Sequence, residues 1–214
     1  MKHPMMTKLL SKHILITFLF LLGGIHSFAT HILIPMDEGK QANHLKAYGI
    51  AYWVLNQDVE VEWLLNYRGG SFLMKAYDGI EKECVIRGVT YEIIADAQAQ
   101  AIRVQISNPE VNMEVMKLEK PPKIAVYTPD GKQPWDDAVT LVLTYAEIPY
   151  DEIYDKEVIE GKLLLYDWLH MHHEDFTGQY GKFYAAYKNA SWYRNEVAKT
   201  EASAKSLGFN KVSE

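Results

Sequence analysis

The period of hydrophobic and polar positions changes repeatedly after residue 30, and this predicts alternating strands and helices. Short apolar or alternating runs predict strands over residues 31–35, 59–67, 89–95, 123–127, 151–154 and 163–172. Helical spacing of apolar residues, or a capping residue followed by a stop, predicts helices over residues 43–57, 79–87, 96–106 and 134–148. This alternation indicates an α/β protein with a mainly parallel, doubly wound sheet.

The clearest linker is a Glu-Lys-Pro-Pro segment that ends at Pro122. It divides the chain into two expected units, residues 30–119 and residues 120–214, each of β–loop–α–β build. The two units align at a constant offset of 92 residues, which places Gly39 on Gly131. A duplication and a chance match both explain so short an alignment.

Residues 1–29 have the pattern of a secretory signal peptide. They carry three lysines and no acidic residue, and the apolar run over residues 14–22 is shorter than the roughly 20 residues that a spanning helix needs. Ser27 and Ala29 supply the small side chains of a cleavage site, so we expect cleavage near Ala29/Thr30. The alternative is a retained membrane anchor. We expect export to the periplasm or the medium, with no permanent membrane anchor after cleavage.

Charge and cysteine content narrow the classes of partner and site. The formal charge is −6, from 28 acidic and 22 basic residues, and it becomes −9 without residues 1–29. This acidic surplus argues against nucleic acid as a partner, because phosphate binding needs clustered Lys and Arg. The single cysteine, Cys84, excludes an intramolecular disulfide and a multi-thiolate metal site. Cys84 lies four residues after Ile80 in a predicted helix, which indicates a buried small side chain. The sequence contains no Gly-x-Ser-x-Gly elbow, so a serine hydrolase of the α/β type would lack its nucleophile.

Three glycine-containing loops are candidate ligand-binding segments. Glu38 and Asp130 begin acidic Gly-Lys loops that each follow a predicted strand and precede a predicted helix. Ligands of doubly wound sheets bind at such carboxyl ends of strands, where a helix N-terminus favours an anion. Arg68, Gly69 and Gly70 form a similar candidate anion cradle. The alternative for all three loops is a turn that uses glycine for its geometry.

The densest polar cluster contains His170, His172, His173, Glu174 and Asp175. In a strand, His170 and His172 share one face with backbones about 6–7 Å apart, a separation that suits two ligands of zinc. Glu174 would continue the same face as a third ligand. Direct contact of His172, His173, Glu174 and Asp175 with a small polar ligand, and a purely structural role, are the alternatives.

Four segments carry a resemblance, and they read HILIPMD at 31–37, WLLNYRGGSF at 63–72, KIAVYTP at 123–129 and HHEDFTGQYGKF at 172–183. Together they resemble a family of exported bacterial proteins often labelled asparagine synthetase B. That family resembles class I glutamine-amidotransferase-like domains of flavodoxin-like α/β build, and its members are considerably longer. The resemblance therefore implies that this chain corresponds to the N-terminal part of a member, with a sheet that is incomplete at its C-terminus.

The residues do not support the reaction in that label. Glutamine-dependent asparagine synthesis needs an N-terminal cysteine and a Ser-Gly-Gly-x-Asp-Ser loop, whereas residue 2 is lysine, the expected mature chain begins at Thr30 and no such loop is present. We therefore expect a non-catalytic or incomplete amidotransferase-like module that binds a small polar ligand. The alternative is an enzyme that acts on an amide, amino acid or sugar. Oligomerisation through an exposed sheet edge is a further expectation.

Overall fold

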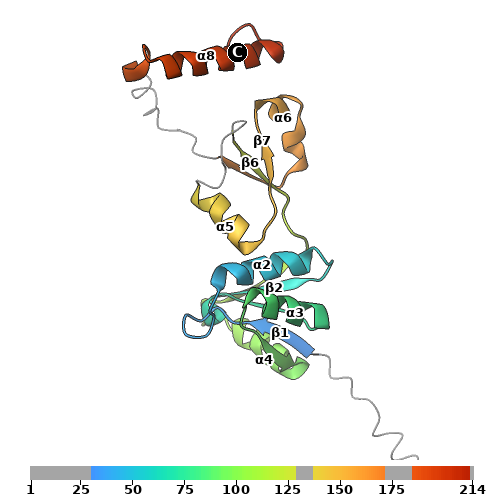
Figure 1. Ribbon diagram of the computed structural model, residues 1–214. Helices are drawn as coiled ribbons and strands as arrows, with labels where there is room; N and C mark the ends of the chain where they lie inside the picture. The colour runs from blue at the N-terminus through green and yellow to red at the C-terminus, as the bar shows by residue number, and fades with distance from the viewer. Residues whose placement is uncertain (1–29, 129–136, 172–184, 213–214) are drawn as a thin grey trace, which may run out of the picture.

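The computed structural model describes residues 30–128, 137–171 and 185–212, and it contains two β-sheets with helices packed against them (Figure 1). The first sheet and its helices comprise β1 (Thr30–Ile34), α2 (His44–Leu55), β2 (Val61–Leu65), β3 (Ser71–Lys75), α3 (Asp78–Arg87), β4 (Glu92–Ala95), α4 (Asp96–Ile106) and β5 (Glu114–Leu118). The second comprises β6 (Ile124–Tyr127), α5 (Ala138–Ala146), β7 (Asp151–Ile153), α6 (Asp155–Ile159), a 3₁₀ turn (Lys162–Leu165) and β8 (Trp168–Met171). Helix α8 (Ser191–Ser206) follows.

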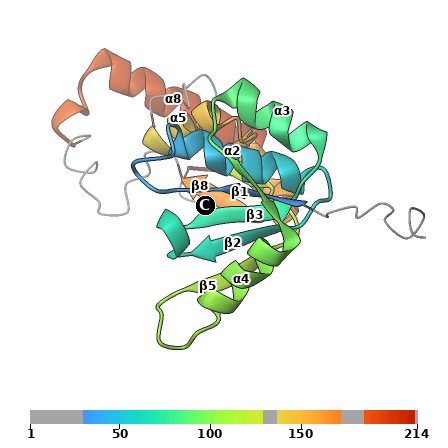
Figure 2. The same cartoon turned by 90° about the horizontal axis from the view of Figure 1, so that it is seen from below.

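The first sheet has the strand order β4-β1-β3-β2-β5, and every neighbouring pair is antiparallel. Helices α2 and α3 cover one face and α4 covers the other (Figure 2). The first four strands with α2 and α3 therefore form a βαββαβ arrangement of ferredoxin-like topology. Helix α4 then connects the edge strand β4 to β5 at the opposite edge.

The expectation of a mainly parallel sheet is wrong for this unit, because strand β3 was not foreseen. Five residues, 66–70, connect β2 to β3, and β3 then lies between β1 and β2 as an antiparallel neighbour of both. Asn66, Arg68, Gly69 and Gly70 all have positive φ, which lets the chain reverse within this short connection. The sequence had indicated only the end of a strand there.

Two cores lie on opposite faces of the first sheet, as the alternation of side chains along its strands requires. Ile32 and Ile34 of β1 pack with Phe72 of β3 against α2 and α3. Leu33 and Leu73 face the other way, against α4. Because these residues are almost completely buried, burial on both faces holds the register of the central strands.

The second sheet has three parallel strands in the order β7-β6-β8, so the parallel βαβ expectation is confirmed for this unit. The predicted helix 134–148 is shorter in the described residues, as α5. The predicted strand 163–172 is wrong at its start, because residues 163–165 belong to the 3₁₀ turn that follows Gly161 (φ 77°); within the described residues only β8 is a strand.

Helices α2 and α5 pack against each other between the two sheets (Figure 1). Gly49 of α2 makes this approach possible, since a Cβ atom there would lie 1.8 Å from the Ala146 carbonyl oxygen. Glu147, just after α5, pairs with Lys46 and lies 3.4 Å from the Arg87 Nε atom. Polar contacts and a close backbone approach therefore join the two units.

Helix α8 contributes no fully buried side chain. The partly buried residues near the second sheet are Thr200 and Ala204 of α8 and Leu207 directly after it, at spacings of four and three. Across residues 30–128, 137–171 and 185–212, every helix is too short or too polar to span a bilayer.

Candidate functional site

The carboxyl ends of β6 and β8 are where the topology of the parallel sheet favours a site. The chain runs from central β6 to β7 on one side and then to β8 on the other. Strand connections thus leave the sheet in opposite directions between β6 and β8, which is where ligands of open α/β sheets bind. Thr128 follows β6, and His170 lies near the end of β8.

His170 and Asp137 form a partly buried pair at this edge. The Nε2 atom of His170 lies 3.0 Å from Oδ1 of Asp137, and their side chains are 17% and 12% exposed. The carboxylate only accepts hydrogen bonds, so Nε2 carries a proton and donates it. When the imidazole is neutral, Nδ1 is then the unprotonated nitrogen, which can accept a hydrogen bond or bind a metal ion.

Asp137 also caps helix α5. Its Oδ1 atom accepts hydrogen bonds from the backbone N–H groups of Val139 at 2.7 Å and Thr140 at 3.2 Å. Burial acts to raise the pKa of Asp137, but the bonds from Thr140, Val139 and His170 outweigh it and lower the pKa below its ordinary value. The carboxylate is therefore held ionised, which fixes the orientation of the His170 ring.

The side chain of Thr128 places a hydroxyl group in the same region. Thr128 is 3% exposed, and its Oγ1 atom has no hydrogen-bond partner among the residues that the structure describes. Its backbone N–H donates to the Ile153 carbonyl at 3.0 Å, which continues the pairing of β6 with β7. Because Val126 pairs with His170, and side chains two apart share a face, Thr128 lies on the His170 face of the sheet.

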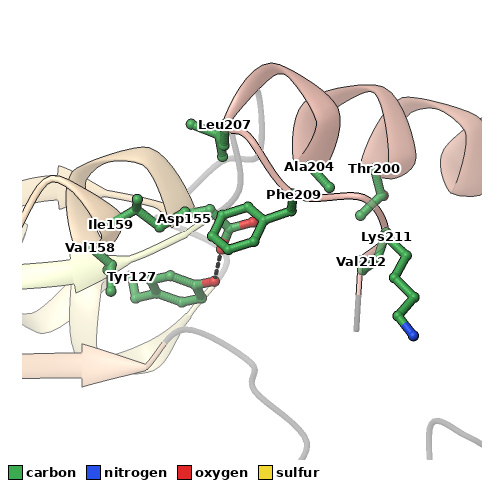
Figure 3. Close-up of a pocket in the computed structure, with 10 residues that line it drawn as sticks. All are labelled: Tyr127, Asp155, Val158, Ile159, Thr200, Ala204, Leu207, Phe209, Lys211 and Val212. Atoms are coloured by element: carbon green, nitrogen blue, oxygen red, sulfur yellow. Dashed lines mark hydrogen bonds between the residues drawn. The ribbon is translucent and has the colours of Figure 1, made fainter. Parts of the chain in front are cut away.

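A pocket of about 300 Å³ lies on the opposite face of the same edge, between α6 and the C-terminal segment (Figure 3). The Tyr127 hydroxyl donates to Asp155 at its floor. Phe209 points toward these two residues, whereas Lys211 points away from them (Figure 3). Val158 and the other apolar lining residues make this pocket less suited to a small polar ligand than the Thr128 face.

Two of the predicted loops lie together in the first unit, away from the parallel sheet. The Arg68 guanidinium donates to Glu92 through two nitrogens, each at 2.9 Å, and to Asp37 at 2.7 Å. These bonds, the Glu92 pair first, raise the pKa of Arg68 above its ordinary value. Glu38 is exposed in the adjacent turn. Arg68 therefore ties the β2–β3 connection to two carboxylates, and an anion would have to compete with both.

Gly69 and Gly70 serve the conformation of the same connection. Both have positive φ, and a Cβ atom at Gly69 would lie 2.3 Å from the Met36 carbonyl oxygen. The Met36 N–H donates to the Arg68 carbonyl at 3.0 Å. The glycines thus allow close packing of two backbones, and their predicted contact with a ligand stays a prediction.

The remaining predicted site residues lie outside the described residues: Asp130, His172, His173, Glu174 and Asp175. Of the predicted zinc ligands, the structure places only His170. No group of three or more His, Cys, Asp or Glu residues within the described ranges could hold a metal ion. His170 has the carboxylate partner typical of a metal-bound histidine, so it fits as one ligand of a zinc site.

Cys84 is buried on α3, as predicted. Burial, together with nearby Glu81 and Glu83, raises the pKa of its thiol to about 12. A thiol with that pKa carries almost no thiolate near neutral pH, so Cys84 does not provide a nucleophile.

Sequence reasoning missed Thr128 and Asp137. Asp137 had a usable signal, because an Asp directly before the apolar run of a helix is a common N-cap. Thr128 had none, since a hydroxyl after a strand is ordinary until its burial is known.

Comparison with family models, curated proteins and solved structures finds no match to this chain.

Proposed function

We propose that this protein is an exported module that binds a small polar ligand at the carboxyl ends of β6 and β8. Three parallel strands in the order β7-β6-β8 support a flavodoxin-like, amidotransferase-like unit, because such folds begin with this order. The resemblance of residues 172–183 to the family labelled asparagine synthetase B supports the same kind of domain. The asparagine synthetase reaction is not part of the proposal.

The buried hydroxyl of Thr128 is the observation that carries this proposal. A buried polar group without a hydrogen bond costs about 1–3 kcal/mol, so stable proteins rarely keep one without a use. A ligand oxygen that accepts from Oγ1 would remove this cost. The unsatisfied group therefore lies where the sheet topology favours binding.

The chemistry of the site favours a carboxamide. Its carbonyl oxygen would accept from the Thr128 hydroxyl, and its N–H groups would donate to Nδ1 of His170. By accepting from Nε2, Asp137 fixes the tautomer of the neutral ring in which Nδ1 is the acceptor. A carboxylate could accept from Thr128 but would offer no donor to His170.

Replacing Thr128 tests the proposal. Thr128→Val keeps the shape of the side chain and removes the hydroxyl, so it should raise the melting temperature of the ligand-free protein. With wild type and L-glutamine or L-asparagine at ten times a dissociation constant of about 1 mM, we expect about 1.4 kcal/mol of stabilisation, or about 3–5 °C. The variant should lose most of the amide-specific part of that shift, which is the shift with L-glutamine or L-asparagine in excess of the shift with L-alanine.

Thr90→Val is the matched control, because Thr90 is exposed in the first unit. It should leave the ligand response unchanged. A wild-type protein that shows no shift with either amide, or a Thr128→Val variant that responds as wild type does, would contradict the proposed site.

The Asp137–His170 pair favours a second candidate function, an enzyme acting on an amide. An imidazole oriented by a carboxylate can act as a general base toward water. Ammonia release from L-glutamine or L-asparagine above a boiled control, abolished by His170→Gln, would favour this function. Binding without ammonia release would favour the module.

Export is the part of the proposal that rests on residues 1–29. N-terminal sequencing of the periplasmic or secreted product should begin at or near Thr30. Recovery of an intact chain beginning at Met1 from the cytosolic fraction would contradict it.

A further inference from the structure

A second pocket, of about 400 Å³, lies on the first sheet and far along the chain from β6 and β8. It forms at one end of the sheet, where β2 begins and β3 ends, and α4 borders it through Arg103. Its size falls within the range of small-molecule sites. Its lining combines acidic and basic side chains: His31, Asp58, Glu60, Glu62, Lys75 and Arg103.

Most of these charged groups are already paired with one another or with a neighbour. Arg103 Nε lies 2.8 Å and 3.0 Å from the two carboxylate oxygens of Glu62, and its Nη2 atom lies 3.3 Å from Nε2 of His31. Since arginine only donates, Nε2 of His31 is the acceptor. On the outer side, Glu60 lies 3.2 Å from the Lys117 ammonium. His31, Glu60, Glu62 and Arg103 are therefore the paired part of the lining.

Lys75 and Asp58 are the exceptions. Among the residues that the structure describes, neither has an ion-pair or hydrogen-bond partner for its side chain, although both line the pocket. Lys75 is the last residue of β3, and Asp58 lies just before β2 with φ 56°. The pocket therefore offers one uncommitted cation and one uncommitted anion.

We propose that this pocket binds a free α-amino acid, whose carboxylate pairs with Lys75 and whose ammonium pairs with Asp58. A zwitterion is the smallest common ligand that satisfies both groups at once. A simple anion is disfavoured, because three of the lining side chains are carboxylates. A simple cation would leave Lys75 unused. Because exposed ion pairs are individually weak, we expect a dissociation constant of about 1–10 mM.

This inference does not rest on the function proposed for the β6–β8 edge, and its ligand set separates the two sites. L-alanine carries both charges of the proposed ligand and no side-chain amide. Propionate is L-alanine without its ammonium group, and ethylamine is L-alanine without its carboxylate. Titration of the ¹⁵N-labelled protein, followed by NMR, should show saturable shifts at Asp58, Val59 and Lys75 with L-alanine. Propionate and ethylamine should bind at least about tenfold more weakly.

Two variants test the assigned groups. Lys75→Met keeps the length of the side chain without its charge, and Asp58→Asn keeps a residue that tolerates positive φ. Each should weaken L-alanine binding at least about tenfold. Lys82→Met and Glu114→Gln are matched controls at exposed positions outside the pocket, and they should bind as wild type does.

Two results would overturn the inference. The first is the absence of saturable shifts at this pocket with L-alanine in a folded wild-type protein. The second is equal binding of L-alanine by wild type, Lys75→Met and Asp58→Asn. L-alanine shifts confined to Thr128 and His170 are a case of the first result, and they would also contradict the amide preference proposed for the β6–β8 edge.

Discussion

The side chain of Asp137 has two roles: it caps α5 and it orients the His170 ring. Both depend on Oδ1, which accepts from two backbone N–H groups and from the imidazole. A helix cap is normally a matter of stability alone. Here the same hydrogen bonds keep the carboxylate ionised, so the stability of α5 and the chemistry of the His170 ring are linked.

Asp137→Ala should therefore lower stability by about 1–2 kcal/mol at pH 7, because it removes the cap of α5. The pKa of Asp137 is lowered in the folded protein. Its stabilisation is thus complete above the ordinary aspartate pKa of about 4 and is lost as the pH falls through the lowered value. Urea unfolding of wild type and variant between pH 7 and pH 3 measures the difference.

Asp137→Asn is the control for the charge, because asparagine caps helices nearly as well as aspartate. It should keep most of the stability at pH 7 and lose the pH dependence. A wild-type advantage over Asp137→Ala that grows as the pH falls would contradict the assignment.

Cys84 provides a second test at the residue scale. Its buried thiol, with a pKa of about 12, should not react with a thiol reagent at pH 8 in the native protein, and it should react once the chain is unfolded in denaturant. Rapid modification of the native protein would mean that α3 opens readily or that Cys84 is not buried.

Single residues could be predicted from the sequence only where local spacing carried the information. The spacing from Ile80 foretold that Cys84 is buried, and a strand-end cluster pointed to His170. The partner of His170 lies 33 positions earlier in the chain, so no local pattern could join them. The glycines beside Arg68 suggested an anion-binding loop. In the structure the Arg68 guanidinium pairs with Asp37 and Glu92, and neither partner could be predicted from the local sequence.

At the scale of elements, the contact between α2 and α5 depends on the absence of one side chain. Gly49 lies in the middle of α2, where glycine usually lowers stability relative to alanine by about 0.5–1 kcal/mol. The close approach of the Ala146 backbone explains why glycine is nevertheless required. A backbone carbonyl cannot move aside as a flexible side chain can.

Gly49→Ala should therefore lower the free energy of unfolding by about 1–3 kcal/mol, reversing the usual sign of this substitution in a helix. Gly39→Ala is the control, because a Cβ atom at Gly39 would meet nothing within 4 Å. Chemical denaturation measures both. A Gly49→Ala protein as stable as wild type would show that the two helices are not packed this closely.

The sequence predicted helices α2, α3 and α4 to within about two residues, because each has a clear start and a periodic or capped body. It missed β3 and β5, which are five residues each and lack strict alternation. Five residues without alternation are a weak strand signal by themselves, although Gly69 and Gly70 before β3 are a turn signal that favours a hairpin. The missing β3 is also why the first sheet was expected to be parallel.

At the scale of the whole molecule, two different sheets share one chain, and both leave edges without a neighbouring strand among the described residues. Strand β8 is one edge of the small parallel sheet, and Trp168 on it is 42% exposed. Unpaired edges with exposed apolar residues favour association between copies. We therefore expect oligomerisation to use the β8 edge.

Wild-type protein should form larger species as its concentration rises, and Trp168→Lys should reduce them, since lysine at an edge opposes pairing. Trp192→Lys on α8 is the matched control, because Trp192 is 47% exposed and lies outside both sheets. Size-exclusion chromatography with light scattering provides the measurement. A protein that stays monomeric across the whole concentration range would refute this edge as an interface.

The central claim is that a ligand with an amide binds between Thr128 and His170, and NMR titration with L-glutamine tests it most directly. We expect saturable shifts at the backbone amides of Thr128, Val139 and Thr140 and at the His170 ring, and their loss in Thr128→Val. Shifts at Asp58 and Lys75 would report the second pocket separately. An absence of shifts at the first set, or the same shifts in Thr128→Val, would contradict the claim.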